Sequence, residues 1–216
     1  MDYAAARRNM VESQLRPNKV TDPALLDALA AVPRESFVPA SLRGVAYVDE
    51  DIPLGRGRFL MEPMILGRLL ELAAVRPSDV ALVVGAGVGY SAAVLARVAS
   101  RVVALEADRE LAQQTAPALR TLGAATVAVV EGALADGAPQ LAPFDVVLFD
   151  GAVDHVPPAI LEQLAEGGRL VAVIKVGGIG RATLMTRQAG VVASRIAFDA
   201  GVPTLPGFEP PAAFTF

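Results

Sequence analysis

The sequence contains no cysteine and no tryptophan, and it has one histidine among its 216 residues. Without cysteine, the chain cannot form disulfides, thiolate metal sites or thiol nucleophiles. His/Glu clusters with the spacing of metal ligands are also missing, so we expect no bound metal. Hydrophobic residues make up 53% of the chain, but no apolar run is long enough to cross a bilayer. We therefore expect no membrane partner.

The net charge and the length of the chain further restrict its possible partners and its architecture. The formal net charge of −4 argues against a nucleic-acid backbone as the main partner. Arg7-Arg8 and Arg56–Arg58 are too short to form a basic patch. The first residues lack the apolar core of a signal peptide, so the expected location is the cytoplasm. The length suffices for one ample hydrophobic core, and we expect a monomer or a homodimer.

Apolar runs alternate with helical patterns over most of the chain. Strands are predicted at 79–84, 101–106, 126–131, 144–150 and 169–176, with weaker ones near 191–198 and 212–216. Helices are predicted between them at 90–98, 109–121 and 158–166. This alternation predicts an α/β fold with a doubly wound, mainly parallel seven-stranded sheet.

An N-terminal helical segment precedes the sheet. We predict helices at 2–15, from Asp22-Pro23 onward and at 63–74, with a loop-like stretch at 33–57. Asp caps a helix and Pro fits its first position, so Asp22-Pro23 is a good helix start. We divide the chain into a substrate-side segment at 1–76 and a cofactor-binding α/β part at 77–216, packed as one compact unit.

A glycine-rich turn follows the first of these strands. Gly85-x-Gly87-x-Gly89 opens directly into a helix, and such turns let the backbone approach a ligand closely. Glu106 ends the next strand, where an acid can bond a ribose diol. The spacing differs from the GxGxxG of dinucleotide sites, and no Gly-Lys-Ser/Thr of a P-loop follows. We infer a nucleoside-containing cofactor.

Two further strand ends carry polar groups. Glu131-Gly132-Ala133 ends the third strand, where the adenine of such a cofactor would lie. Asp150 ends the fourth strand, where it could touch cofactor or substrate. Gly167-Gly168 is predicted to cap the helix at 158–166. The alternative for each is ordinary turn chemistry.

Several segments carry a more specific resemblance: MVESQL at 10–15, VPRESFVP at 32–39, IPLG at 52–55, GAGVGYSAAVLA at 85–96 and LEQLAEGGRLV at 161–171. Together they resemble the protein-L-isoaspartate O-methyltransferase family of class I S-adenosylmethionine-dependent methyltransferases, over roughly residues 10 to 176. The resemblance implies a Rossmann-like methyltransferase fold. It also implies cofactor-binding positions at Gly85, Ala86, Gly87, Gly89, Glu106, Ala107, Glu131, Gly132 and Ala133.

The family reaction moves a methyl group from S-adenosylmethionine to the α-carboxylate of an isoaspartyl residue in damaged protein, and leaves S-adenosylhomocysteine. The resemblance therefore implies a protein or peptide carboxylate as partner. A carboxylate is already ionised at pH 7, so this chemistry needs no general base. Alignment of the reacting groups can supply about 7–11 kcal/mol.

This chain departs from the family at the substrate-contacting stretch, which in the family reads Thr-Ile-Ser-Gln-Pro after Gly-Gln. Here Met61 stands where the family has its active-site Ser, and Glu62 replaces the neutral Gln. A glutamate about 4 Å from a substrate carboxylate would cost about 4 kcal/mol at an effective dielectric near 20. Arg58 could offset this by bridging Glu62 and the substrate. The plain alternative is a solvated Arg58–Glu62 pair.

The candidate catalytic residues are thus Glu62, Arg58 and Asp150. Two cofactor positions also differ from the family, because Val83 replaces an acid and Ala133 replaces Asp. Three functions remain open at this point. The chain is an isoaspartyl-type carboxyl methyltransferase with altered substrate selection, a methyltransferase for another small molecule or peptide with Glu62, Asp150 or His155 as base, or an inactive cofactor-binding module.

Overall fold

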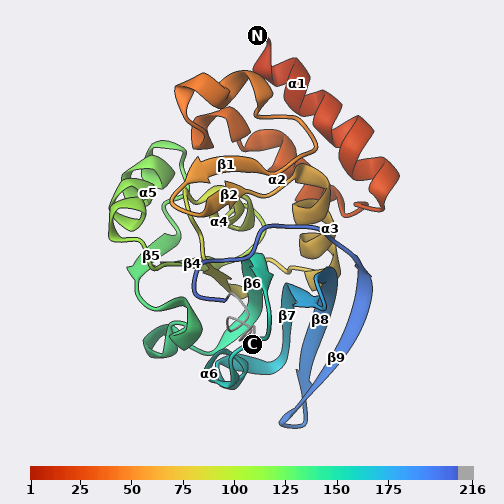
Figure 1. The fold of residues 1–216 in the computed structure, drawn as a ribbon, viewed down its shortest axis with the longest axis vertical. Helices are drawn as coiled ribbons and strands as arrows, with labels where there is room; N and C mark the ends of the chain where they lie inside the picture. Colours follow the sequence, from red (N-terminus) through yellow and green to blue (C-terminus); the bar gives the residue numbers. More distant parts are fainter. Residues whose placement is uncertain (209–216) are drawn as a thin grey trace, which may run out of the picture.

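The computed structural model of the chain describes residues 1–208. Its centre is a seven-stranded sheet in the spatial order β5-β4-β3-β6-β7-β8-β9 (Figure 1). The strands are β3 (Val80–Val84), β4 (Arg101–Glu106), β5 (Val127–Glu131), β6 (Phe144–Val153), β7 (Leu164–Val176), β8 (Ile179–Gln188) and β9 (Val191–Asp199). Pairing is parallel from β5 to β7, and β8 is antiparallel to both of its neighbours. The expected mainly parallel α/β sheet is confirmed.

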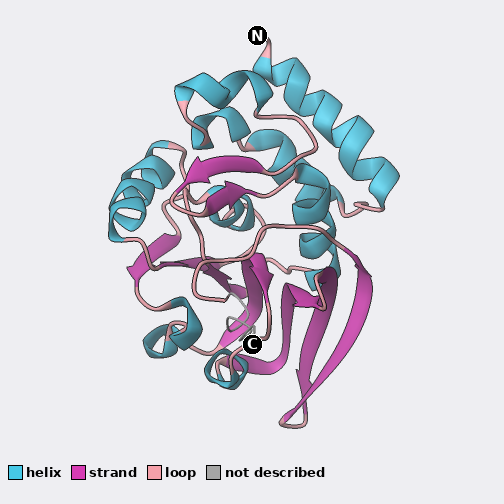
Figure 2. Cartoon of the chain, in the orientation of Figure 1, coloured by secondary structure: helices cyan, strands magenta, loops and turns pink. Residues whose placement is uncertain are grey.

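Helices cover the sheet, and an N-terminal helical layer lies beyond its upper end (Figure 2). They are α1 (Tyr3–Met10), α2 (Pro23–Ala31), α3 (Pro63–Ala73), α4 (Tyr90–Leu95), α5 (Arg109–Thr121) and α6 (Pro158–Glu162). Aspartates cap three of them. Asp2, Asp22 and Asp108 accept hydrogen bonds from the backbone N–H groups three residues on, at 2.9, 2.9 and 3.0 Å. Such caps satisfy donors that a helix N-terminus leaves unpaired.

The N-terminal helical segment is also confirmed, and it contains irregular turns. The helix expected at 2–15 continues past α1 as a π-helical turn at Val11–Leu15, followed by a 3-10 turn at Arg16–Asn18. The stretch predicted as loop contains two 3-10 turns, Arg34–Phe37 and Ala40–Val45, and the short hairpin β1 (Ile52–Gly55) and β2 (Arg58–Leu60). This hairpin forms a two-stranded sheet separate from the main one.

The sheet separates two hydrophobic cores. Ala81 and Val83 of β3 belong to the core with α2, α3, α4 and the N-terminal segment. Leu82 and Val84 belong to the opposite core with α6. Alternate residues of a strand point to opposite faces. Both faces of β3 are therefore covered, which explains why its sequence is apolar throughout.

Two expectations for the C-terminal part of the chain are wrong, and a third concerns residues that the structure does not describe. The helix predicted at 158–166 ends at Glu162 and β7 begins at Leu164, so Gly167-Gly168 is not its C-cap but lies within β7. After the helix, the Gln163 carbonyl accepts from the N–H of Phe144 at 2.9 Å, so the chain joins the sheet at Leu164. The Gln163 side-chain amide donates to the carbonyl oxygens of Asp136 and Ala159 and accepts from the N–H of Ala138. The strand expected near 212–216 lies outside the described residues.

Strand β8 was not predicted, although the sequence carries a signal for it. Gly177 and Gly178 join β7 to β8, and both have positive φ, at 60° and 84°. Two successive residues with positive φ are what a tight type I′ hairpin requires, and Gly-Gly meets that requirement.

The glycine at position 89 is required by packing. Its φ is +89°, and an added Cβ would lie 2.7 Å from the Thr115 side chain of α5. Gly123 also has positive φ, at +75°, but an added Cβ there would meet nothing within 4 Å. We expect Gly123→Ala to cost about 1 kcal/mol of unfolding free energy through backbone strain alone. Gly89→Ala should cost a further 1–3 kcal/mol or so, because it adds overpacking.

Urea denaturation of the two variants beside the parent chain measures this difference. Equal losses for both variants would contradict the packing argument for Gly89.

Candidate active site

Parallel pairing brings three strand ends to one edge of the sheet. Val84 of β3 pairs with Leu105 of β4 and with Phe149 of β6. The residues that follow these partners are Gly85, Glu106 and Asp150. Residues predicted to serve one site from three separate sequence positions therefore lie together at the carboxyl edge, where open α/β sheets bind ligands.

The glycine turn is anchored by its backbone. The N–H groups of Gly85 and Ala86 both donate to the Leu105 carbonyl, at 2.9 and 3.0 Å. Gly87 has a φ of +54°, and a Cβ added there would approach nothing closer than the Gly85 carbonyl oxygen at 4.0 Å. The chain thus turns sharply at Gly87 and leaves open space beside it, which suits close approach by a ligand.

Glu106 is completely buried and holds four hydrogen bonds. Its Oε1 accepts from Arg58 Nη2 at 2.6 Å and from the N–H of Asp108 at 2.8 Å. Its Oε2 accepts from Arg58 Nε at 3.2 Å and from the N–H of Gly87 at 2.8 Å. A carboxylate has about four lone-pair positions. The protein's own groups therefore saturate the acid that was predicted to bind a ribose.

Both interpretations of the sequence placed Arg58 beside Glu62, but the structure does not. The Arg58 side chain is 4% exposed and forms a buried ion pair with Glu106. A forked guanidinium matches the two oxygens of a carboxylate, and burial favours the fully paired arrangement over a solvated one. The solvated Arg58–Glu62 pair is wrong, and in this structure Arg58 does not bridge Glu62 to a substrate.

The hairpin β1–β2 holds Arg58 over the end of β4. Arg56 at its turn bonds Asp108 at 3.0 Å and also bonds Glu110. These contacts attach the hairpin to the first turn of α5, directly after Glu106. Ala107 lies exposed between the two attachment points. Arg56 in the turn and Arg58 at the start of β2 thus hold the hairpin against the predicted cofactor edge.

Asp150 receives a hydrogen bond from the Ser91 hydroxyl of α4. Burial raises the pKa of Asp150 to about 7, opposed mainly by the Ser91 hydrogen bond and then by Arg34 and Arg58. A carboxyl group with a pKa near 7 can hold or release a proton at physiological pH. Asp150 can therefore exchange a proton near pH 7 at this edge of the sheet, and its role in contacting cofactor or substrate stays a prediction.

Glu62 lies immediately before α3 and is half-buried beside two other acids. Its backbone N–H donates to Asp51 at 2.9 Å, and that of Met64 donates to Asp49 at 3.0 Å. Burial raises the pKa of Glu62 to about 7, with further upward contributions from Asp51 and Asp49. Burial likewise raises the pKa of Asp51. Glu62 is thus partly neutral near pH 7.

Arg34 is a site residue that the sequence analysis missed. Its side chain is completely buried, donating from Nε to the Ala46 carbonyl at 2.7 Å and from Nη2 to the Met61 carbonyl at 2.6 Å. The guanidinium also lies over the Tyr90 ring, 5.0 Å from its centroid. Within residues 1–208, no carboxylate forms an ion pair with it. Through the bond to the Met61 carbonyl, Arg34 fixes the backbone that follows β2. The signal that could have revealed it is its place in the VPRESFVP segment.

The segment after β9 covers the carboxyl edge between β3 and β6. The N–H of Leu205 donates to the Ala152 carbonyl at 2.8 Å, and the Leu205 side chain is 3% exposed. A Cβ added at Gly85 or at Gly151 would lie 2.7 Å from a Leu205 side-chain atom. A cavity of only about 10 Å³ remains there, lined by residues that include Asp51, Met61, Asp150 and Leu205. The acceptor side of the site is closed in this structure.

The side of this edge where the sequence analysis predicts adenine is open. A cavity of about 300 Å³ is lined by Val130–Ala133 and by residues 136–141. Glu131 lies at its edge with a half-exposed side chain, 3.9 Å from Arg109. The N–H of Gly132 donates to the Glu106 carbonyl at 3.1 Å, which joins this cavity to the end of β4. Glu131, Gly132 and Ala133 therefore line a space of ligand size at the end of β5, and their contact with a cofactor stays a prediction.

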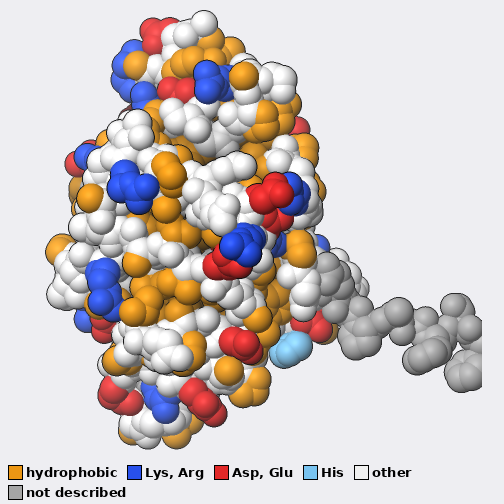
Figure 3. Space-filling model, turned by 90° about the vertical axis from the view of Figure 1, so that its left-hand side faces the viewer, with side chains coloured by type: hydrophobic (Ala, Val, Ile, Leu, Met, Phe, Trp, Pro, Cys, Tyr) orange, Lys and Arg blue, Asp and Glu red, His pale blue; other side chains and the backbone are white. Residues whose placement is uncertain are grey.

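His155 lies outside this cluster. Its imidazole is 67% exposed and contacts the neighbouring Asp154 at 2.7 Å. Histidine is visible at the surface in Figure 3, on a face where charges of both signs mix with apolar side chains. Within the described residues, no three acids or histidines come together as a possible metal site. None of the described helices is both long and apolar enough to span a bilayer.

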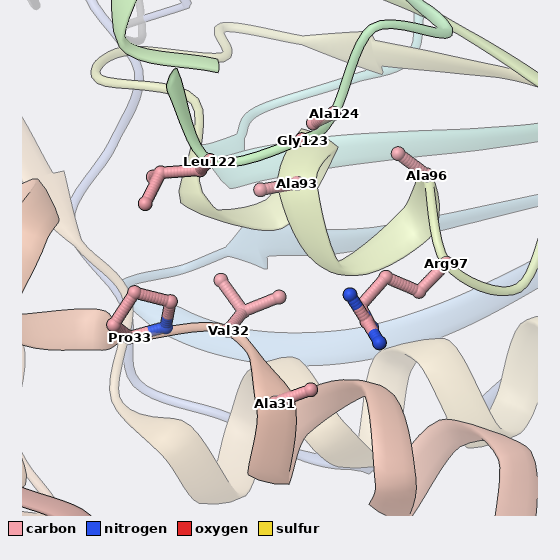
Figure 4. Close-up of a pocket in the computed structure, with 9 residues that line it drawn as sticks. All are labelled: Ala31, Val32, Pro33, Ala93, Ala96, Arg97, Leu122, Gly123 and Ala124. Carbon is pink, nitrogen blue, oxygen red and sulfur yellow. The ribbon is translucent and has the colours of Figure 1, made fainter. Parts of the chain in front are cut away.

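Another cavity, of about 230 Å³, lies between the end of α2, helix α4 and the turn before β5 (Figure 4). Its lining is small and mostly apolar: Ala31, Val32, Pro33, Ala93, Ala96, Arg97, Leu122, Gly123 and Ala124. Residues 122–124 precede β5, so this cavity lies toward the amino edge of the sheet. Arg97 is its one ionisable lining group, which leaves it without acid–base chemistry.

The raised pKa of Asp150 predicts a pH-dependent loss of stability. The native state binds this proton more tightly than the unfolded chain, so stability falls as pH rises from about 4 to about 7. Asp150→Asn removes the titrating group and keeps an acceptor for Ser91. At pH 8 we expect this variant to exceed the parent by on the order of 1–2 kcal/mol, with a flatter profile from pH 4 to 8.

Urea unfolding across this pH range measures the effect. The control is Asp199→Asn, at a carboxyl group whose side chain is 83% exposed. A parent profile that Asp150→Asn leaves unchanged would contradict the assignment.

Comparison with known proteins gives a consistent result. The family model described as protein-L-isoaspartate(D-aspartate) O-methyltransferase (PCMT) matches residues 6–199. The protein-L-isoaspartate O-methyltransferase of Methylorubrum extorquens (strain PA1) is 45% identical over 184 residues, which cover 85% of this chain and 79% of the relative. That of Koribacter versatilis (strain Ellin345) is 38% identical over 188 residues, with 87% and 85% covered.

The fold agrees with a solved structure from Plasmodium falciparum in complex with S-adenosyl-L-homocysteine. The two chains align with a TM-score of 0.80 at 17% identity, over 92% of this chain and 97% of the other. The chain combines the glycine turn, the acid that ends β4 and the seven-stranded sheet with sequence identity to these relatives along most of its length. This chain belongs to the protein-L-isoaspartate O-methyltransferase family.

Proposed function

We propose that this chain transfers a methyl group from S-adenosylmethionine to an isoaspartyl carboxylate in protein, with substrate selection altered at Met61 and Glu62. The observation that carries the proposal is the meeting of the glycine turn, Glu106 and Asp150 at one sheet edge in a chain of this family. Family membership supports the reaction class. The substrate preference rests on the residues that differ.

The residues present fit an adenosyl cofactor, with one qualification. Gly87 leaves open space at the turn, and the cavity beside Glu131, Gly132 and Ala133 can take an adenine ring. Glu106 lies between them, but it can bond a ribose only after Arg58 has moved. When bound, S-adenosylmethionine supplies an electrophilic methyl group on a sulfonium.

The chain itself contributes position and exclusion of water. The Gly85–Gly87 backbone and Glu106 would hold the cofactor, and Ala86, Ala107 and Gly89 lie along the same turns. Arg34 fixes the Met61 carbonyl through a 2.6 Å hydrogen bond and so holds the acceptor side of the site. The acceptor carboxylate arrives ionised, so no side chain has to remove a proton from it. Alignment is the main catalytic contribution available here.

Glu62 can admit a carboxylate substrate when it is protonated. Its neutral carboxyl group has an O–H that can donate a hydrogen bond, as the family's glutamine amide can. When ionised, it would repel a carboxylate about 4 Å away by about 4 kcal/mol at an effective dielectric near 20. We infer that the protonation of Glu62 controls acceptance of the substrate.

A second candidate function is methyl transfer to a hydroxyl or amine acceptor. The observation favouring it is that Asp150 and Glu62 both have pKa values near 7, which suits a general base. Exposed His155 is a weaker candidate because it lies outside the cluster.

A methyl-transfer assay with matched isoaspartyl, aspartyl and serine peptides tests the two functions. Transfer to the isoaspartyl peptide alone supports the first proposal. Transfer to the serine peptide in preference supports the second. Absence of transfer to any peptide, with cofactor bound, would overturn both and favour an inactive cofactor-binding module.

The proposed control by Glu62 predicts a pH profile. With a pKa of about 7, Glu62 is about nine-tenths ionised at pH 8 and about one-tenth at pH 6. The kcat/KM of the parent for an isoaspartyl peptide should therefore fall roughly tenfold from pH 6 to pH 8. Glu62→Gln should abolish this fall and give the higher activity at pH 8.

The matched control is Glu50→Gln, which removes an exposed charge from the same acidic run. Glu50 raises the pKa of Glu62 less than Asp51 and Asp49 do, so this variant should keep the fall in activity and move it only slightly toward lower pH. A Glu62→Gln variant no more active than the parent at pH 8 would refute the electrostatic argument.

A further inference from the structure

The carboxylate that a nucleoside cofactor needs is held by a side chain of the protein itself. We propose that Arg58 is an affinity-determining residue that competes with the ribose hydroxyls of the cofactor for Glu106. Binding then exchanges one set of hydrogen bonds for the other. This inference rests on the proposed function only in requiring a ligand that carries a ribose diol.

The hydrogen-bond count at Glu106 makes the competition unavoidable. Arg58 and the N–H groups of Gly87 and Asp108 make two contacts to each carboxylate oxygen. A ribose diol donates two hydrogen bonds, and no lone pair remains for them. The two N–H groups belong to the backbone turns on either side of the ligand position. Arg58 comes from β2, 48 residues before Glu106, so it is the donor that can leave.

Arg58 is incompletely satisfied in its present position. Its side chain is 4% exposed, and its Nη1 has no hydrogen-bond partner among the described residues. Leaving a buried donor unpaired is unfavourable. The ion pair with Glu106 therefore leaves one donor of Arg58 that could gain a partner when the side chain moves.

The turn beside Arg58 can move without breaking hydrogen bonds of the main sheet, whereas Ile52 and Leu60 keep the base of the hairpin buried in the core. β1 and β2 pair only with each other in a separate two-stranded sheet. The turn residues Gly55, Arg56 and Gly57 all have positive φ, at 84°, 54° and 70°. Apart from Arg58, the charged contacts of the turn to α5 are made by Arg56, which is 51% exposed. Exposed ion pairs contribute little to stability.

Release of Arg58 would also affect the segments that close the acceptor side of the site. β2 leads directly into Met61 and Glu62, and an added Cβ at Gly57 would lie 3.0 Å from Pro206 in the segment that closes the site. Cofactor binding would thus loosen the hairpin and the adjoining cover together. The acceptor pocket of about 10 Å³ would open only after the cofactor has entered.

Binding of S-adenosylhomocysteine, measured by calorimetry, tests the competition. The variant is Arg58→Gln, which places the glutamine that the family resemblance indicates at this position. Its Kd should be at least about tenfold lower than that of the parent, which corresponds to about 1.4 kcal/mol. The control Arg195→Gln removes an exposed arginine on β9, away from the cofactor edge, and should leave the Kd within about twofold.

A second variant guards against loss of folding, because removing one partner of a buried pair can be strongly destabilising. Arg58→Lys keeps the charge but cannot hold both carboxylate oxygens as a fork. It should give a smaller gain in affinity. Hydrogen exchange provides an independent readout: S-adenosylhomocysteine should speed exchange at residues 55–60 and slow it at residues 85–89 of the parent chain.

The outcomes separate the two proposals. Tight binding by the parent, with equal or weaker binding by folded Arg58→Gln or Arg58→Lys, would overturn the competition and leave the proposed function intact. Absence of binding by the parent and by both folded variants would overturn the competition and the proposed function together. Binding by Arg58→Gln and not by the parent would support both.

Discussion

Parallel pairing of β3 with β4 on one side and with β6 on the other is the constraint on which the site depends. Val84 is in register with Leu105 and Phe149, so the next residue of each strand reaches the same edge. Two N–H groups of the glycine turn then bond the Leu105 carbonyl and fix the turn to β4. A slip of one residue in either pairing would place Glu106 or Asp150 on the opposite face of the sheet.

The buried ionisable side chains around this edge are stabilised in three different ways. Arg58 and Glu106 pair with each other, and backbone N–H groups complete the carboxylate. Arg34 donates to backbone carbonyls and lies over an aromatic ring. Asp150 has its pKa raised by burial and is partly neutral near pH 7. Each solution avoids an isolated buried ion, which would be very costly.

The departures from the family pattern that we identified in the hairpin region fall within seven residues. Arg58, Met61 and Glu62 lie between Gly57 and Pro63, on β2 and at the start of α3. Met61 is itself buried in the core at 3% exposure, and the fold is maintained by the apolar strands and the glycine turn. The three departures do change the donors and acceptors that face the cofactor edge and the acceptor side. The chain remains a member of the family, and these differences are the basis for the proposed change in substrate selection.

Much of this could be predicted from the sequence. Apolar strands, Asp helix caps and the glycine turn are local signals, and each reports on neighbours a few residues away. They determined the α/β sheet, the N-terminal helices and the positions of Gly85, Glu106 and Asp150. Gly177-Gly178 is an equally local hairpin signal that precedes β8.

Tertiary structure alone decided which charges meet. Arg58 is four residues from Glu62 and 48 from Glu106, yet it bonds Glu106 because the hairpin folds over the end of β4. Arg34 reaches the Met61 carbonyl, and Leu205 covers Gly85, although both pairs are also far apart in the sequence. Strand periodicity shows which face a residue occupies, but it does not specify which distant side chain lies opposite. That choice follows from packing of the whole chain, since a buried ion is stable only where the completed fold supplies its partner.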